Sequence, residues 1–387
     1  MNKLIVGPLK KSGISTVIVI DALDECKDRE PASAILFILE QFVSQIPNVK
    51  FFLSGCPSPQ ILREFNLPQL AKAIDTFVLH EVEPSQVDSD IQLFFRQSLL
   101  EIANCHGWLD GWPTKEQLDL LCVQAAGLFV YAVATVKFIG YKNWNPRVQL
   151  DRILQSPENS AYEGRTKFNP NTTLDSLYMS FLQEAFGNDL QEHDPIIRSI
   201  LGAVILAANP LSPFEIAALL GLDPTGLFPQ LSSLQSLLIL QGNNSPVQVF
   251  HKSFPDFIID PTRCNNERFY ISPPTHHLEL LLGCLKLMNK TLEKNMCKLP
   301  DAVLNLEVDD LHERIKQYLS PALQYACRSW HKHLVDEDAA NTPAVTSVLH
   351  HFLENKFLFW LEVLSVLGAA REAVDALGVV AQQLKVC

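Results

Sequence analysis

The 387 residues include 43 acidic and 31 basic side chains, a formal net charge of −12 at neutral pH, and 47% of them are hydrophobic. This balance is typical of a folded chain of two to four packed units and excludes general disorder. The acidity argues against a nucleic-acid partner or an anionic membrane, because both are bound through clustered Lys and Arg. The nine cysteines form no Cys-x-x-Cys pair, which favours reduced thiols. No apolar run reaches the ~20 residues of a bilayer span, so we expect a cytoplasmic protein without membrane segments.

Two short runs of mostly apolar residues near the start of the chain predict parallel strands. They cover residues 17–20 and 49–53, and a helix-like segment at 31–45 separates them. Strand, helix and strand in this order are typical of a parallel βαβ unit, whose strands are buried on both faces. Residues 77–80 predict a third strand. Strand signals then nearly disappear until about residue 237, which indicates a change of domain.

Helical periodicity dominates the middle of the chain. Apolar residues recur three and four apart between residues 89 and 153, as at Ile91, Phe95 and Leu99, and this spacing predicts helices that face a core. The polar stretch 155–173, which Pro and Gly interrupt, predicts a linker or a long loop.

The segment after this linker has the pattern of a winged helix. Ser212 and Glu215 form a capping box, in which each side chain accepts a hydrogen bond from the other residue's backbone amide, and the helix that begins there ends at Gly221. A Gly and Asn turn between two apolar runs predicts a hairpin. The elements expected in this order are helices at 196–208, 212–221 and 225–237 and a hairpin at 238–250.

The remainder of the chain is again helical, without a convincing repeat of fixed period. It predicts an irregular helical domain with segments near 276–294, 309–334, 343–353 and 357–384.

Three carboxylates follow the first predicted strand: Asp21, Asp24 and Glu25. Open α/β sheets bind their ligands at the carboxyl ends of the strands. A strand of this kind is typical of the Walker B element of nucleotide hydrolases, in which Asp21 would hold Mg²⁺, directly or through water, and Asp24 or Glu25 would orient or deprotonate the attacking water. The alternative is that acidic residues end a strand in a solvated loop.

Residues 21–26, Asp-Ala-Leu-Asp-Glu-Cys, resemble the Walker B signature of NACHT domains of the STAND class. The similarity is to fungal NLR-like proteins and to the nephrocystin-3-like N-terminal domain in particular. Other segments resemble the same family in the same order, so that the resemblance covers about residues 14–365. These segments are 51–59 as the sensor strand, 126–132 as the helical-lid motif, 210–221 as the start of the winged helix, and 251–257 as its phosphate-sensing His segment.

The resemblance implies an α/β fold followed by mostly α structure. A partial P-loop-type parallel sheet, a helical lid, a winged helix and a C-terminal irregular helical domain would follow one another, with ATP or ADP and Mg²⁺ as cofactors. The expected domains are 1–85 for the partial nucleotide-binding domain, 86–160 for the lid, 161–275 for the winged helix and 276–387 for the C-terminal domain.

Two departures from the family pattern concern the phosphates. No Gly-x-x-x-x-Gly-Lys-Ser/Thr phosphate-binding loop is present. The most similar segment, residues 7–13, is followed by Ile14 where the motif has Lys. Only sixteen residues precede Val17, too few for a strand, a phosphate loop and a helix, so the chain is expected to begin inside the nucleotide domain. Cys56 occupies the sensor position that is Arg in the family, and a thiol cannot replace a guanidinium at a phosphate. Cys56 is expected to be an inert, buried residue of the nucleotide site.

Three further residues gain a role from the resemblance. His251 would contact the β-phosphate of ADP and hold the winged helix on the nucleotide domain, although a histidine at a strand end can also be purely structural. Gly127 and Leu128 would lie beside the adenine, or they break a helix.

Other site classes are not supported by the sequence. The adjacent and near-adjacent histidines, such as His331 and His333, lack the i, i+4 spacing of a zinc helix. The third helix of the predicted winged helix has no Lys or Arg, so it is not expected to bind DNA. No Gly-x-Ser-x-Gly elbow indicates a hydrolase.

The sequence therefore predicts a signal-transduction ATPase module whose nucleotide switch is incomplete or inactive, with protein partners and self-association as its contacts. A non-catalytic helical scaffold derived from such a protein is the alternative, and a folded remnant without function is a third.

Overall fold

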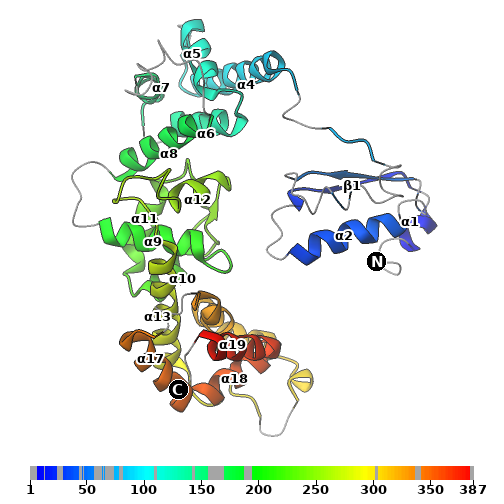
Figure 1. Ribbon diagram of the computed structural model, residues 1–387, viewed down its shortest axis with the longest axis vertical. Coiled ribbons are helices and arrows are strands. Elements are labelled where there is room, and N and C mark those ends of the chain that lie inside the picture. Colours follow the sequence, from blue (N-terminus) through cyan, green and yellow to red (C-terminus); the bar gives the residue numbers. More distant parts are fainter. Residues whose placement is uncertain are drawn as a thin grey trace. The chain divides into compact units, whose positions relative to one another are not determined.

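The computed structural model describes fifteen segments of the chain, which divides into two units, Met1–Val82 and Glu83–Cys387 (Figure 1). Each unit has its own buried core. The described residues are 7–12, 14–23, 29–42, 46, 48–55, 63, 65, 74–77, 82–108, 111–141, 144–155, 170–186, 194–300, 304–335 and 341–383.

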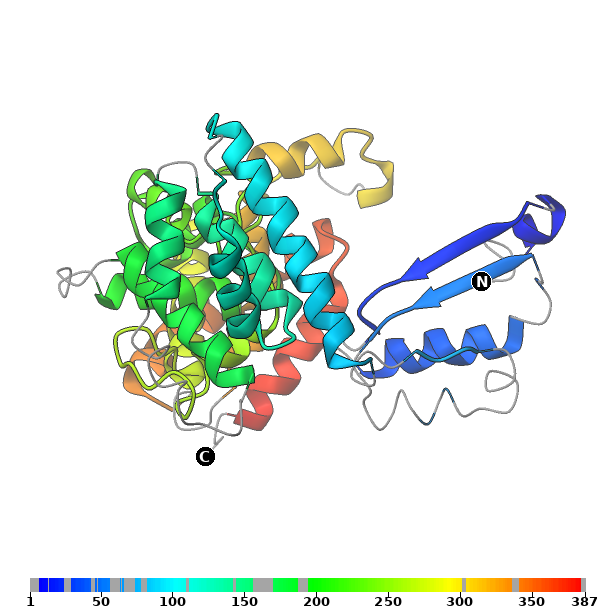
Figure 2. The ribbon, with the colours of Figure 1, turned by 90° about the horizontal axis from the view of Figure 1, so that it is seen from above.

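The first unit is built on a pair of parallel strands joined by a helix. β1 (Thr16–Ile20) pairs with β2 (Val49–Leu53), so that Ile18 lies opposite Phe51. Figure 2 shows α2 (Arg29–Phe42) running along this pair. The predicted βαβ unit is confirmed for these residues. The short helix α1 (Gly7–Ser12) precedes it and was not expected.

The strands of the first unit are buried on one face only. Ile20, Phe51 and Leu53 pack with Leu36 and Leu39 of α2. The alternate side chains on the opposite face are more than 60% exposed: Val17, Val19 and Phe52. The expectation that both faces are buried is therefore wrong within this unit, because one helix can cover only one face of a two-stranded sheet.

The predicted third strand is only partly within the described residues. Phe77, its first residue, belongs to no strand and is 77% exposed. Residues 78–80 lie outside the described part of the chain.

The second unit is almost entirely helical. Its N-terminal helices are α4 (Pro84–Cys105), α5 (Lys115–Ala125), α6 (Phe129–Ile139), α7 (Pro146–Leu154) and α8 (Pro170–Phe186). The next group is α9 (Asp194–Leu206), α10 (Pro213–Leu220), α11 (Pro224–Ser232), the strands β3 (Leu238–Ile239) and β4 (Gln248–Val249), and α12 (Ser253–Ile258). The last group is α13 (Pro273–Thr291), η7 (Asn305–Glu307), α14 (Leu311–Tyr318), α15 (Pro321–Ser329), η8 (Trp330–His333), α17 (Pro343–Asn355), α18 (Phe357–Val366) and α19 (Ala370–Gln383).

The capping box and the hairpin of the second unit are confirmed. The backbone amide of Glu215 donates to the Ser212 hydroxyl, and the Glu215 carboxylate accepts from the amide of Ser212. Gly221 ends α10 in the left-handed conformation. Leu238 and Ile239 pair in antiparallel with Val249 and Gln248. Three helices followed by a hairpin is the expected order, and the assignment as a winged helix stays a prediction.

Several predicted boundaries are corrected by the structure. The expected linker 155–173 ends earlier, because α8 begins at Pro170. The third helix of the predicted winged helix ends at Ser232 and gives way to turns before the hairpin. Two long segments are divided: 309–334 at Ser320, which caps α15, and 357–384 at Gly368, whose φ of +65° cannot continue a helix.

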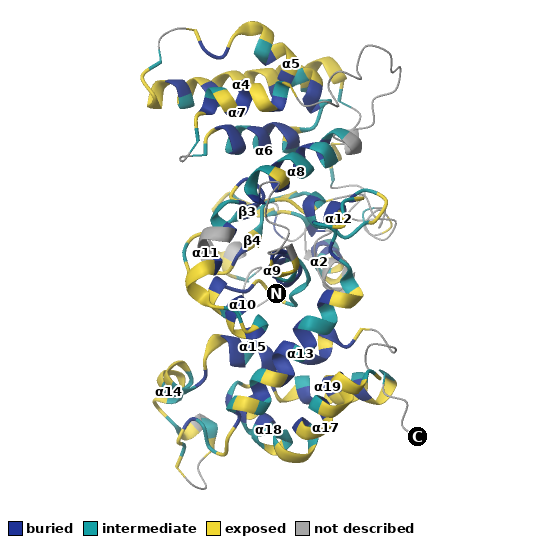
Figure 3. Ribbon diagram, turned by 90° about the vertical axis from the view of Figure 1, so that its left-hand side faces the viewer, coloured by how far each residue is buried: buried dark blue, intermediate teal, exposed yellow. Residues whose placement is uncertain are grey.

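Helix α13 is the centre of the second unit and packs against α9, α10, α15 and α17. Two glycines allow the closest of these contacts. A Cβ on Gly202 would lie 2.3 Å from His276, and one on Gly283 would lie 2.3 Å from the carbonyl oxygen of Leu219. Figure 3 shows the buried side of α13 within this group of helices. The predicted winged helix and the C-terminal helices therefore share one continuous core.

No helix in the described part of the chain is both long and apolar enough to cross a membrane.

Candidate functional site

The carboxyl ends of β1 and β2 bring Asp21 and Ser54 together. The Ser54 hydroxyl donates to Asp21 Oδ1 and accepts from the backbone amide of Ala22 at 3.0 Å. Two backbone bonds continue the pairing past the strands, from Ser54 to Ile20 at 3.0 Å and from Leu23 to Ser54 at 2.9 Å. Ala22 has a φ of +54°, a conformation that turns the chain sharply after Asp21. Asp21 is exposed, so its carboxylate lies at the solvent-accessible end of the strand pair.

The other residues predicted for this end of the sheet are not described. Asp24, Glu25 and Cys56 lie outside the described residues, and their roles stay predictions. Among the described residues, no group of three or more His, Cys, Asp or Glu side chains could hold a metal ion. The metal role of Asp21 therefore also stays a prediction.

Gly127 and Leu128 form the turn between α5 and α6. Ala126 and Gly127 both have positive φ values, +47° and +75°, and the Leu128 amide donates to the carbonyl of Ala125 at 2.8 Å. A Cβ placed on Gly127 would lie 4.0 Å from Val87 Cγ1 in α4. These residues therefore form a break between two helices, which is the structural alternative. Their contact with an adenine stays a prediction.

His251 follows β4 and is held by its own chain. Its Nδ1 accepts a hydrogen bond from the backbone amide of Ser253 at 3.2 Å and lies 2.7 Å from the Ser253 hydroxyl. In the neutral ring the proton must then be on Nε2, which is a hydrogen-bond donor. The orientation and tautomer of His251 are therefore fixed through Nδ1.

Helix α8 anchors this segment through a buried tyrosine. The Tyr178 hydroxyl lies 2.7 Å from the Ser253 hydroxyl, which links Tyr178, Ser253 and His251 in one chain of hydrogen bonds. Tyr178 is 2% exposed, and burial raises the pKa of its hydroxyl. One turn earlier, Asp175 accepts from two nitrogens of Arg263, at 3.1 and 2.6 Å. Neither α8 nor these partners was expected from the sequence, although helical spacing marks the residues Leu174, Leu177, Tyr178, Phe181 and Leu182.

The two predicted nucleotide contacts of the second unit lie near opposite ends of α6. Leu128 caps its first turn, whereas Lys137, in its last turn, lies over the ring of Phe250, the residue before His251. Nine residues of helix correspond to about 14 Å. A single ligand in contact with both sites would have to extend along the helix.

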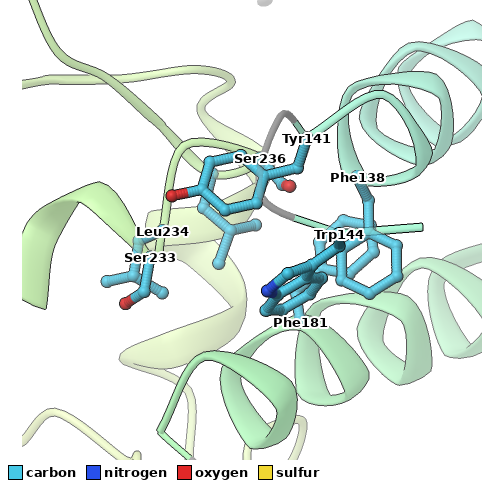
Figure 4. A pocket seen from close by; sticks show the side chains of 8 residues that line it. Phe138, Tyr141, Trp144, Phe181, Ser233, Leu234 and Ser236 are labelled. Atoms are coloured by element: carbon cyan, nitrogen blue, oxygen red, sulfur yellow. The ribbon is translucent and has the colours of Figure 1, made fainter. Parts of the chain in front are cut away.

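A small cavity beside the end of α6 is not a nucleotide pocket. Figure 4 shows its aromatic lining, with Tyr141 and Trp144 near Phe138 and Phe181. The rings of Phe138 and Phe181 are stacked at 4.5 Å, and the Tyr141 hydroxyl donates to the carbonyl of Ser232 at 3.1 Å. The open volume of about 10 Å³ has room for one water at most.

His277 and His333 are far apart in the sequence but lie side by side in the structure. His277 Nδ1 lies 2.9 Å from His333 Nδ1, and His333 Nε2 lies 2.8 Å from the Tyr325 hydroxyl. Because that hydroxyl also accepts from the amide of Ala208 at 2.9 Å, its proton is directed to His333. Burial lowers the pKa of His333 to about 3. The pair links α13 to η8 in the neutral state.

Comparison with known proteins finds a distant relative that matches nearly the whole chain. The vegetative incompatibility protein HET-E-1 of Podospora anserina is 22% identical over 94% of this chain. This chain spans 26% of the length of that relative. No protein-family description and no solved structure matches. The match supports a family-level kinship of this chain with fungal NLR-like signalling proteins.

Proposed function

We propose that this chain is a NACHT, STAND-class signal-transduction module in which the nucleotide switch is incomplete. The observation that supports the proposal most is the parallel pair β1–β2, which ends with the Asp21 carboxylate bonded to Ser54. This is where a P-loop-type sheet would place a metal-binding carboxylate. The distant kinship with HET-E-1 supports the same class.

The second unit would supply the responsive half of such a switch. His251 lies in a segment that Tyr178 and Ser253 hold in place. In a switch of this class a bound nucleoside diphosphate favours one state over the other only by contacts that differ between the states. His251 would make such a contact with the β-phosphate, and Asp21 would hold the Mg²⁺ that this class uses.

Weak nucleotide binding is expected from the residues present. The 387 residues contain no phosphate-loop lysine, and Cys56 replaces the sensor arginine. Both lost groups are cations that would form charge-assisted bonds to phosphate. We therefore expect ADP to bind more weakly than ~1 μM, a free energy of about −8 kcal/mol, and ATP hydrolysis to stay at background.

Calorimetric titration of the full chain with ADP and ATP in the presence of Mg²⁺, together with a hydrolysis assay, tests the proposal. His251→Ala should reduce the residual binding, whereas His350→Ala, which removes an exposed histidine of α17, should not. Micromolar affinity together with turnover would show an intact switch. Binding that is absent at millimolar ADP would favour the scaffold.

The scaffold alternative has one observation of its own. Val17, Val19 and Phe52 form an apolar face of the first unit, and exposed apolar faces favour protein contacts. Sedimentation of the wild-type chain and of Val19→Lys would show whether this face supports self-association.

A further inference from the structure

One face of the strand pair β1–β2 is exposed and carries both apolar and charged side chains. Successive side chains of a strand point to opposite faces, and burial alternates in the same way along both strands. The helix α2 covers one face only (Figure 2). On the other face the strand register places Val17 opposite Lys50 and Val19 opposite Phe52. The three apolar side chains are more than 60% exposed, and Lys50 is exposed as well.

Asp21 continues this face at the carboxyl end of the strands. It comes two positions after Val19, and its Oδ1 accepts a hydrogen bond from Ser54, which comes two positions after Phe52 on the neighbouring strand. A cation, apolar side chains and an anion therefore follow one another over four residues of strand, or about 13 Å. We call this surface the open face, and it consists of Val17, Val19, Asp21, Lys50 and Phe52.

The two charges of the open face have no ion-pair partner in the described part of the chain. Neither Lys50 nor Asp21 takes part in the salt bridges of the described residues. They do not pair with each other within one copy, because they lie at opposite ends of the strands. The ammonium of Lys50 and Oδ2 of Asp21 can therefore both bind groups of another molecule, and the exposed apolar side chains between them favour a protein contact.

The open face is complementary to itself. Two sheets that pack face to face lie about 10 Å apart with their strands nearly aligned. A two-fold axis that runs across the strands at the level of Val19 makes the strands of the second copy antiparallel to those of the first. Lys50 of each copy then lies at the level of Asp21 in the other, displaced sideways by one strand spacing of about 4.8 Å, which a long lysine side chain can span. With the strands parallel, Lys50 would instead lie over Val17 of the other copy.

We propose that two copies of this chain associate through their open faces in the antiparallel arrangement. A Lys50–Asp21 ion pair forms at each end, because such an interface uses the same surface on both copies, and Val19 and Phe52 of both copies lie in the centre. Three apolar side chains per copy cover much less than the roughly 800 Å² per partner of a standard stable complex. The dimer is therefore weak and reversible, with a Kd on the order of 100 μM. It does not depend on nucleotide binding.

Sedimentation equilibrium of the full chain between about 10 and 500 μM tests this inference. The wild type should show a monomer–dimer equilibrium. Lys50→Glu places two acids at each end of the interface and Asp21→Lys places two lysines there, so each variant alone should raise the Kd roughly tenfold or more. An equimolar mixture of the two variants has one acid and one lysine at both ends, and its Kd should return to within about threefold of the wild type. This recovery requires position 50 of one copy to meet position 21 of the other.

Two matched controls make the same changes in net charge outside the first unit. Lys115→Glu and Asp309→Lys are at exposed positions of the second unit, and both should leave the Kd of the dimer unchanged. Phe52→Ala tests the apolar centre without a change in charge and should raise the Kd by about tenfold, because aromatic side chains contribute most at the centre of an interface. Circular dichroism of every variant establishes that each remains folded.

Three results would overturn the inference. A wild type that stays monomeric up to about 500 μM would show that a second copy does not cover the open face. An equal loss of association in Lys115→Glu would show that net charge, and not Lys50, is responsible. A mixture that associates no better than its two components would exclude the antiparallel arrangement. Titration with ADP is a separate measurement, so the nucleotide proposal can fail while the dimer stands, and the reverse.

Discussion

The two units of the molecule differ in how their predicted site residues are supported. In the first unit, Asp21 lies at the end of two strands that one helix covers, with Val17, Val19 and Phe52 exposed on the other face. In the second unit, His251 is tied to a buried tyrosine, and that tyrosine belongs to a continuous core. The difference indicates that the core of the second unit fixes the position of His251. In the first unit, Asp21 lies on a two-stranded sheet that is packed on one face only.

This difference predicts that truncating an aromatic side chain to alanine lowers the free energy of unfolding by different amounts in the two units. Trp360 is fully buried among Trp330, Phe352 and Phe357, and its indole N–H donates to the carbonyl of Cys327 at 2.8 Å. Trp360→Ala should lower the free energy of unfolding of the second unit by about 3–5 kcal/mol.

Phe52→Ala is the counterpart in the first unit, where the side chain is 61% exposed. It should change stability by no more than about 0.5 kcal/mol. Urea unfolding followed by circular dichroism measures both variants. Equal losses would contradict the contrast between the units.

A pair of glycines tests how tightly α13 is packed. A Cβ on Gly283 would meet the backbone oxygen of Leu219 at 2.3 Å, whereas one on Gly378 in α19 would meet nothing within 4 Å. Gly283→Ala should therefore destabilise the fold by about 1–3 kcal/mol through overpacking. Gly378→Ala should stabilise it by roughly 0.5–1 kcal/mol through helix propensity. Thermal unfolding of the two variants should shift in opposite directions, and a shift in the same direction would argue against the close contact.

The histidine pair predicts a loss of stability in mild acid. His333 has a pKa lowered to about 3 in the folded chain, against about 6.5 when unfolded, so the unfolded state binds more protons between these values. Its contribution is complete above about pH 6.5 and is lost as the pH falls toward 3, by up to ~1.4 kcal/mol per pH unit. Burial also lowers the pKa of His277, which acts in the same direction.

Urea unfolding between pH 7 and 5 measures this dependence, above the range in which most carboxylates titrate. His333→Gln should flatten the slope, and His350→Ala, at an exposed position, should leave it unchanged. An unaltered slope in His333→Gln would rule out the buried pair as its source.

A local effect is expected at the strand ends of the first unit. Ser54→Ala removes the hydroxyl that bonds to Asp21 and to the amide of Ala22. The local free energy of opening should fall by about 1 kcal/mol. Faster hydrogen exchange at the Ala22 amide, with unchanged exchange in α13, would support this prediction, whereas unchanged exchange at Ala22 would show that the hydroxyl does not hold this turn.

Local patterns accounted for much of the fold. The capping box of Ser212 and Glu215, the glycine that ends α10 and the parallel strands all follow from short-range chemistry, and the structure has them. Helix α8 was not predicted because its first turn, from Pro170, lies in a polar stretch that resembles a linker. The unbroken segments 309–334 and 357–384 were wrong because helical periodicity continues across Ser320 and Gly368, where the backbone changes direction.

Candidate site residues could be named from the sequence only where a family motif marked them. Asp21 and His251 were named from such motifs, but Lys137 has no motif, and its contact with Phe250 joins residues 113 positions apart (250 − 137). The same holds for His277 and His333, which are 56 positions apart. Their spacing does not fit a zinc helix, yet the fold brings them together. Contacts of this kind depend on how helices pack, which a single sequence does not encode locally.

Thermal unfolding of the full chain with ADP, with and without Mg²⁺, tests the central claim most directly. A ligand that binds the folded state at ten times its Kd adds about 1.4 kcal/mol to stability. We predict that millimolar ADP raises the midpoint, that Mg²⁺ adds little, and that the rise is lost in His251→Ala. A Mg²⁺-dependent rise at micromolar ADP, or no rise at any concentration, would contradict the claim of an incomplete nucleotide switch.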